Sequence, residues 1–252
     1  MNIDFHTHGK LSKKVPFSLA TFTEALNEAK AAGLHAIALT EHFNAQYFSE
    51  TYNSLDKHFT YHHHYYVVNG IKVFPGVEVD AKDGGHFLFI GTRDDISNFW
   101  IALQPHRTPE TFLPAEDLLD MAAAYPFLKI GAHPFRRSNP LTQHKDSVFQ
   151  RLDALDLNGK DLYTLGRKMK DKLTVFAYQK ELPLLAGSDT HHHFQYGAVY
   201  NVFFKSCETI ADLKESIAEG SYDLYLSPHL EVQVKGANAL KKLLKPLALE
   251  EK

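Results

Sequence analysis

The chain has 252 residues, enough to bury a large core in one domain, which we expect to span residues 1–252. Hydrophobic residues make up 44% and charged residues 23%, and the formal net charge of -3 gives no general attraction to nucleic acid or anionic membranes. No apolar run could span a bilayer and no signal-peptide pattern opens the chain, so we expect a cytoplasmic protein without a membrane partner.

The predicted elements alternate between strands and helices along the chain. Strands are expected at 2–5, 35–39, 71–79, 86–91, 129–132, 152–157, 184–186 and 198–204, with a hairpin turn at 82–85. Helices are expected from the N-cap Ser18 to Gly33, and at 47–66, 114–124, 160–181, 209–219 and 236–244. This alternation predicts an α/β protein with largely parallel pairing, either a barrel or an open sheet.

Histidine and cysteine are used very unevenly. Cys207 is the single cysteine, which excludes a disulfide framework and a thiolate zinc finger. By contrast there are 16 histidines, more than packing requires, and this excess points to metal chemistry or proton handling.

Two pairs of candidate ligands follow predicted strands with the same spacing. His6 and His8 flank Thr7 after the first strand, and Asp189 and His191 follow the strand at 184–186. Residues i and i+2 of an extended chain point to the same side, so each pair can reach one cation or two neighbouring cations.

Four further candidates stand at the ends of other strands. They are His42, His86, His133 and Glu78, and the proline after His133 favours an extended backbone there. Glu78 lies in an otherwise apolar strand, where an unpaired carboxylate would be costly, so it is the natural bridge between two cations, with Asp80 as a weaker rival. The histidines at 62–64 are expected on a solvated helix face. Imidazole and carboxylate groups converging from several strand ends favour a multinuclear metal site.

Taken together, these motifs resemble the PHP (polymerase and histidinol phosphatase) family of metal-dependent phosphoesterases. The resemblance rests on Asp4-Phe5-His6-Thr7-His8, Thr40-Glu41-His42, Gly76-Val77-Glu78, Gly85-His86-Phe87-Leu88, Ala132-His133-Pro134 and Ser188-Asp189-Thr190-His191. It implies a distorted (β/α)7, TIM-like barrel with the metal site at the C-terminal ends of the strands. It also implies one ion at His6, His8, Glu78 and Asp189, a second at Glu78, His86 and His133, and a third held by His42 and His191.

One segment departs from the family pattern. Many members carry an Asp or His a few residues after the His-x-His pair, whereas this chain has Gly9-Lys10-Leu11-Ser12-Lys13-Lys14. The lysines could supply positive charge to a substrate or to the space of a third ion. The site is therefore predicted to hold two or three divalent ions, and mixed His and carboxylate ligands suit zinc, manganese and iron alike.

The predicted function is hydrolysis of a phosphate ester, by a phosphatase or phosphodiesterase of histidinol-phosphatase-like type. The substrate would be a small phosphorylated metabolite or nucleotide, attacked by a metal-activated water. Glu78, Asp189 and His191 are the expected catalytic residues, and the expected substrate-binding residues are Arg136, Arg137, Lys10, Lys14 and, as a further candidate, Lys13. The alternatives are an amidohydrolase-type enzyme and a non-catalytic metal-binding regulatory domain. The acidic balance disfavours a nucleic-acid partner.

Overall fold

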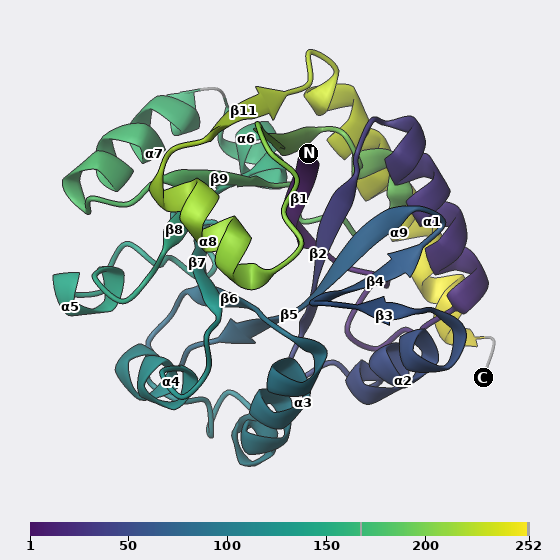
Figure 1. The fold of residues 1–252 in the computed structure, drawn as a ribbon, viewed down its shortest axis with the longest axis horizontal. Helices are drawn as coiled ribbons and strands as arrows, with labels where there is room; N and C mark the ends of the chain where they lie inside the picture. Colours follow the sequence, from purple (N-terminus) through teal and green to yellow (C-terminus); the bar gives the residue numbers. More distant parts are fainter. Residues whose placement is uncertain (167, 251–252) are drawn as a thin grey trace.

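The computed structural model describes residues 1–166 and 168–250 (Figure 1). The strands are β1 (Asn2–Thr7), β2 (Ala36–His42), β3 (Tyr61–His62), β4 (Tyr65–Val68), β5 (Ile71–Asp80), β6 (His86–Ile90), β7 (Leu128–Ala132), β8 (Ala154–Asn158), β9 (Leu184–Gly187), β10 (Val199–Phe203) and β11 (Tyr222–Leu226). The helices are α1 (Leu19–Ala31), α2 (Phe48–His58), α3 (Arg93–Ala102), α4 (Ala115–Ala122), α5 (Asp146–Phe149), α6 (Gly159–Leu165), α7 (Lys168–Gln179), α8 (Ile210–Ala218) and α9 (Leu230–Glu250).

Seven strands form a nearly closed, distorted barrel, which confirms the predicted fold class. The order along the sheet is β11-β10-β1-β2-β5-β6-β7-β8-β9. The last strand returns to the first where Thr7 pairs with Thr190. Helices surround this ring of strands, as Figure 1 shows.

Strand β6 runs against the direction of its neighbours. It pairs antiparallel with both β5 and β7, whereas β1–β2, β2–β5, β7–β8 and β8–β9 are parallel. The tight hairpin that reverses the chain contains Gly84 and Gly85, both at positive φ. Because β6 is reversed, its first residue, His86, lies opposite Asp80 at the carboxyl end of β5. A strand beginning and several strand ends therefore meet at one end of the barrel.

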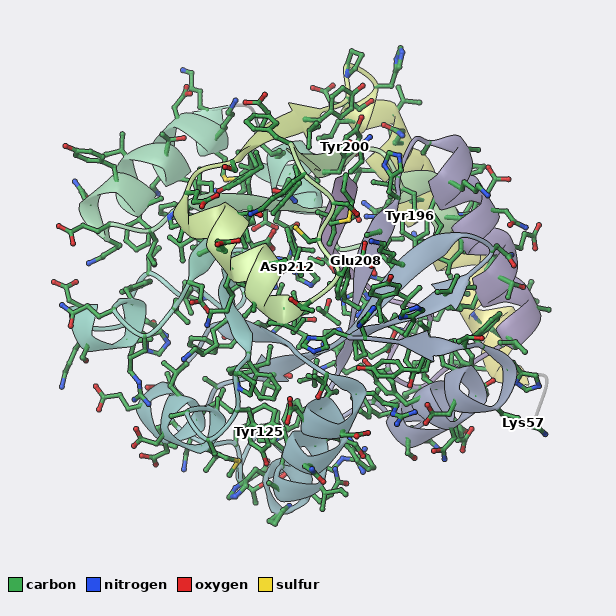
Figure 2. The ribbon with its side chains drawn as sticks, viewed as in Figure 1. Lys57, Tyr125, Tyr196, Tyr200, Glu208 and Asp212 are labelled. Atoms are coloured by element: carbon green, nitrogen blue, oxygen red, sulfur yellow. The ribbon has the colours of Figure 1, made fainter. Side chains whose placement is uncertain are left out.

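The opposite end of the barrel is closed by α8. Its apolar residues Ile210, Leu213 and Ile217 pack into a buried cluster with residues of the strand beginnings, such as Ile3 and Leu128. In Figure 1 this helix lies in front of the strands, and Figure 2 labels Glu208 and Asp212 beside its first turn. The helix starts with a capping box, in which Thr209 and Asp212 satisfy each other's backbone N–H groups.

Three local predictions are wrong. The helix predicted at 47–66 ends at His58, and the remainder forms the β3–β4 hairpin, because Tyr65–Val68 is β-prone and pairs with β5. The histidines at 62–64 consequently lie on this hairpin and not on a helix. The long helix predicted at 160–181 is divided into α6 and α7 by Gly166, whose φ is +80°.

Candidate metal centre

Three groups of side chains with metal-binding chemistry lie at the carboxyl end of the barrel. They are His6, His8 and Asp189; His6, Glu78 and His133; and His8, His42 and His191. In each group the potential ligand atoms lie within 4.8 Å of one another. The structure thus brings together seven of the eight predicted ligands, which come from five different strands or the segments that follow them.

Glu78 lies at the centre of the cluster and is almost fully buried. Its Oε1 is 3.1 Å from Nε2 of His133 and 3.6 Å from Nε2 of His6. Its Oε2 is 2.9 Å from Nδ1 of His42 and 3.4 Å from Nε2 of His8. Each carboxylate oxygen therefore faces a different pair of imidazoles, which is the arrangement a bridging ligand needs.

His86, the eighth predicted ligand, lies against Glu78 but in none of the three groups. Its Nδ1 is 2.6 Å from Oε1 of Glu78, and its Nε2 is 2.8 Å from Oδ1 of Asp80. Burial would lower the pKa of His86, but the two carboxylates outweigh it and raise the pKa to about 9. Asp80 also forms an ion pair with Lys13, at 3.1 Å.

The ring orientation of His6 is fixed by a residue that the sequence analysis did not select. Nδ1 of His6 lies 2.9 Å from Oδ2 of Asp156, on β8, so Nδ1 carries the proton and Nε2 is left as a potential ligand. The close approach depends on Gly187, where a Cβ would lie 2.4 Å from the Cβ of His6 and 2.6 Å from Oδ1 of Asp156. Asp156 could have been identified from the sequence by the signal that identified Glu78, because it is a carboxylate within the apolar strand 154–157.

Asp189 connects the metal ligands to two cations. Its Oδ1 is 3.4 Å from Nε2 of His8, while its Oδ2 is 2.8 Å from Nη2 of Arg136 and 3.6 Å from Nζ of Lys160. Burial would raise the pKa of Asp189, but Lys160 and Arg136 hold it well below its usual range. Lys160 lies in the first turn of α6, which is capped by Asn158, and this helix start positions its side chain. Lys160 was not predicted from the sequence, because a single lysine in a helical pattern carries no signal.

Two of the potential ligands have strained backbones. His133 has a φ of +30° and Asp189 a φ of +55°, although neither is glycine. The extended conformation predicted for His133 is therefore wrong. Such conformations cost about 1–3 kcal/mol each and persist where surrounding contacts fix them. Two hydrogen bonds fix these conformations here. The backbone N–H of His133 donates to Asp156, and the backbone N–H of Asp189 donates to the carbonyl oxygen of His6.

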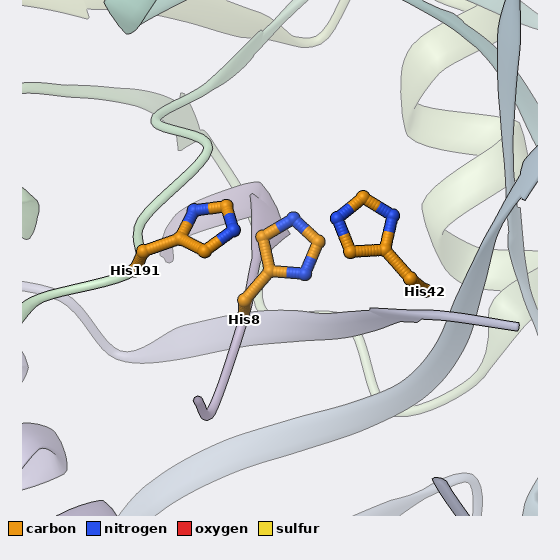
Figure 3. Close-up of side chains that lie close together, drawn as sticks. All are labelled: His8, His42 and His191. Atoms are coloured by element: carbon orange, nitrogen blue, oxygen red, sulfur yellow. The ribbon is translucent and has the colours of Figure 1, made fainter. Parts of the chain in front are cut away.

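The third group forms a row of imidazoles, shown in Figure 3. The ring of His8 stacks on that of His42 with centroids 4.6 Å apart, and the ring of His191 lies 4.3 Å away on its other side. Nδ1 of His191 donates to the carbonyl oxygen of Asp189 at 3.0 Å, which leaves Nε2 free to accept. Burial lowers the pKa of His42 to about 4 and that of His191 well below its usual value. Both rings are therefore neutral at pH 7, the form that binds a metal.

The donor set fits divalent metal ions. Nε2 of His6, both ring nitrogens of His8 and Oε2 of Glu78 are buried and make no hydrogen bond within the part of the chain that the structure describes. Buried polar atoms without partners are costly, and cations would satisfy them. The mixture of imidazoles and carboxylates suits transition-metal ions.

The predicted substrate-binding residues are placed very differently. Arg136 is held beside Asp189, and Arg137 and Lys160 line an adjoining open cavity of about 510 Å³. Lys10 is buried, with its Nζ 3.6 Å from Oε2 of Glu41, whereas Lys14 is exposed. Position in the sequence alone did not separate the buried lysine from the exposed one.

The family of the chain is shown by its similarity to known proteins. The sequence profile of the PHP domain matches residues 4–225, so the chain belongs to the PHP domain family, as predicted. Its site is accordingly that of a metal-dependent phosphoesterase-like protein with room for several ions. No curated protein sequence matches the chain significantly.

Several solved structures share the fold at low sequence identity. PsfC from Pseudomonas syringae PB-5123 has a TM-score of 0.81 at 20% identity, with 96% of this chain and 98% of that chain covered. The lesion-specific endonuclease PfuEndoQ from Pyrococcus furiosus has a TM-score of 0.67 at 24% identity, covering 88% of this chain and 57% of that chain. An amidohydrolase from Chromobacterium violaceum with bound sulfate has a TM-score of 0.53 at 15% identity, with coverage of 86% and 97%. The chain thus spans little more than half of the endonuclease.

No helix in residues 1–166 and 168–250 is both long and apolar enough to cross a membrane.

Proposed function

We propose that this protein is a metal-dependent phosphomonoesterase that acts on a small phosphorylated compound. The observation that carries the proposal is the contact between Asp189, a candidate metal ligand, and the two cations Arg136 and Lys160. A phosphoryl group bound at the metal centre would meet both cations beside it. Divalent cations held by His6, His8, His42, Glu78, His133, Asp189 and His191 would activate water and neutralise charge on the phosphoryl group.

Arg136 is oriented to donate hydrogen bonds to a phosphate oxygen. Its Nε donates to Oδ1 of Asp161 at 3.0 Å and its Nη2 to Oδ1 of Asn158 at 3.1 Å. Among the described residues, none accepts a hydrogen bond from Nη1. A guanidinium fixed on one edge and open on the other is suited to phosphate, because its planar geometry matches the phosphate oxygens.

Lys160 and Arg137 complete the positive side of the site. Lys160 is partly exposed and can move from Asp189 to an incoming phosphate. Arg137 lines the same cavity and is exposed, so we assign it to the approach of the substrate and not to the reacting group. We assign no role in phosphate binding to the exposed Lys14.

Glu78, Asp189 and His191 are the residues that we propose for catalysis. Burial would raise the pKa values of Glu78 and Asp189, but neighbouring cations and imidazoles hold both well below the usual range, so the two carboxylates are ionised at pH 7. Two ionised carboxylates hold cations in place. His191 presents a neutral Nε2 to the same space.

The test is hydrolysis by protein stripped of metal and reloaded with Mn²⁺, Zn²⁺ or Fe²⁺. We expect release of phosphate from p-nitrophenyl phosphate and from phosphorylated metabolites, abolished by chelation, with at least two ions per chain by elemental analysis. Hydrolysis of cyclic amides without any phosphate release would support the amidohydrolase alternative. Full metal loading with no hydrolysis of either class would support a non-catalytic domain.

A further inference from the structure

A second, smaller cavity adjoins the metal centre at His8 and His191, and neither Arg136 nor Arg137 is among its lining residues. It has a volume of about 160 Å³. Its wall includes His8, Lys10, Phe22, His191, Tyr196 and Leu244. The larger cavity touches Lys160 and Arg136, which contact Asp189, whereas the smaller one touches Thr190 and His191, so the two flank the same short segment. A substrate lying across the metal centre would place its phosphate on one side and its remaining part in the smaller cavity.

Lys10 presents a buried ammonium group to this cavity. The residue is 4% exposed, and its Nζ makes no hydrogen bond to any residue that the structure describes. The nearest carboxylate, Glu41, lies at 3.6 Å, beyond hydrogen-bond range, and its other oxygen accepts the N–H of Gly9 at 2.7 Å. A buried ammonium with three unused donors is costly, and an acceptor in the cavity would offset that cost.

A second ammonium group comes from α9, which lies beyond the part of the chain matched by the family profile. Lys241 is partly buried and stands one turn before Leu244, on the same face of the helix. The helix packs against α6 and against the turn His193–Gln195, which closely follows His191, another residue of the cavity wall. Burial lowers the pKa of Lys241 to about 8, so it is still mostly charged at pH 7. No described carboxylate lies within 4 Å of its Nζ.

The charges around the cavity do not cancel. Glu41 is a single carboxylate, and its Oε2 lies 3.6 Å from the ammonium group of Lys10. Asp189 already contacts Arg136 and Lys160 and belongs to the metal cluster. Lys245, one turn further along α9, is exposed and adds positive charge. The remaining wall is largely apolar, with Phe22 and Leu244 among its side chains.

We propose that this cavity binds the leaving group of the substrate, and that it selects a small leaving group carrying a second anionic group, such as a carboxylate, held by Lys10 and Lys241. The proposal rests on the phosphomonoesterase function proposed above. The apolar wall would contact the short carbon chain, and the volume excludes a large leaving group. On this assignment α9 supplies substrate specificity to a metal centre built entirely by the family domain.

The experiment compares 3-phosphoglycerate with glycerol 3-phosphate, because these substrates differ only in a carboxylate against a hydroxymethyl group. We expect the metal-loaded wild-type protein to have the higher kcat/KM for 3-phosphoglycerate. Lys241→Met should reduce the ratio of the two kcat/KM values by about tenfold, since the variant loses a charge-assisted hydrogen bond to the carboxylate. The loss should fall mainly on KM, with metal content unchanged.

Lys242→Met is the matched control, because Lys242 is the neighbouring lysine of α9 and is exposed. Lys242→Met should leave the ratio of the two kcat/KM values as in the wild type. Lys241→Arg keeps the positive charge and should retain much of that ratio. Lys10→Met should also lower the ratio, but it leaves Glu41 buried without its cation and could unfold the protein. Lys241→Met therefore decides the question alone.

The outcomes separate this inference from the proposed function. An enzyme that hydrolyses p-nitrophenyl phosphate but does not prefer 3-phosphoglycerate overturns the assignment of the cavity and leaves the phosphomonoesterase function standing. An unchanged ratio in Lys241→Met overturns it as well. A metal-loaded protein that hydrolyses no phosphate ester contradicts the proposed function itself.

Discussion

The two ends of the barrel differ in whether their buried polar groups have hydrogen-bond partners. At the amino end, α8 closes the barrel with apolar side chains, and the buried Asn201 satisfies its amide with Ile3 and Ala186. At the carboxyl end, Glu78, His6 and His8 are just as deeply buried, yet several of their polar atoms have no hydrogen-bond partner in residues 1–166 and 168–250. The amino end therefore stabilises the fold without any bound ligand, whereas the carboxyl end depends on ligands for its stability. Changes at the two ends should separate stability from metal binding.

The largest expected effect is that of Glu78→Gln. A neutral amide cannot offset the charge of two cations, so turnover should fall by at least about 10³-fold and metal content should drop. The apoprotein should stay folded, because the amide keeps the shape of the side chain. Elemental analysis and circular dichroism measure both properties.

Glu208→Gln is the control for Glu78→Gln at the other end of the barrel. Glu208 pairs with Lys72 and with the hydroxyl of Tyr65. Its neutral form should lower stability slightly and leave metal content unchanged. Equal loss of metal in both variants would contradict the separation of the two ends.

Leu213→Ala should give the largest loss of stability without loss of metal binding. Leu213 is fully buried in α8, and truncation of a buried leucine costs about 2–5 kcal/mol of unfolding free energy. Urea unfolding of the apoprotein measures this cost. The folded fraction should still bind the wild-type number of ions; a reduced number would mean that the two ends are coupled.

Asp156→Asn tests the support of the metal ligands. Asp156 accepts hydrogen bonds from Nδ1 of His6, from the His133 N–H and from Asn158. Loss of such a partner lowers metal affinity by about 10–100-fold. Competition with a chelator measures the affinity. Asp153→Asn is a suitable control, because Asp153 lies before β8, at the amino end, and contacts Lys129 and Lys214.

The smallest expected effect is a dependence of apoprotein stability on pH. The folded-state pKa of His86 is raised from 6.5 to about 9 by Glu78 and Asp80, against the opposite effect of burial. A raised pKa stabilises the fold fully below pH 6.5, and this contribution is lost as the pH rises towards about 9. The urea midpoint of the apoprotein should therefore fall over this interval.

His86→Gln should remove much of that slope. Saturating metal should flatten it in the wild type, because cations replace the protons that Glu78 otherwise attracts to its histidines. A wild-type apoprotein whose stability rises from pH 6.5 to 9 would contradict the assigned direction.

The sequence predicted the fold class, the family and most of the side chains that meet at the carboxyl end. Apolar β-prone runs followed by His or acidic residues are local signals, and Glu78 was found because a carboxylate is costly inside an apolar strand. The sequence could not show which ends of non-adjacent elements meet. The reversal of β6 was readable from its glycine turn, but the contact of Asp156 with His6 depends on how β8 and β1 lie on either side of β9, where Gly187 leaves room for it.

The remaining features were decided by tertiary structure alone. Lys10 and Lys14 are equivalent in sequence terms, yet Lys10 is buried beside Glu41 and shares a cavity wall with Phe22 of α1, whereas Lys14 is exposed. Leu244 lines the smaller cavity because α9 packs against α6 and the turn His193–Gln195, and an amphipathic pattern does not specify where a helix docks. The β3–β4 hairpin likewise depends on the pairing of β4 with β5. The sequence by itself determined which chemical groups the site could use, since those are set by residue type and strand periodicity; tertiary packing decided which of them lie close enough to act together.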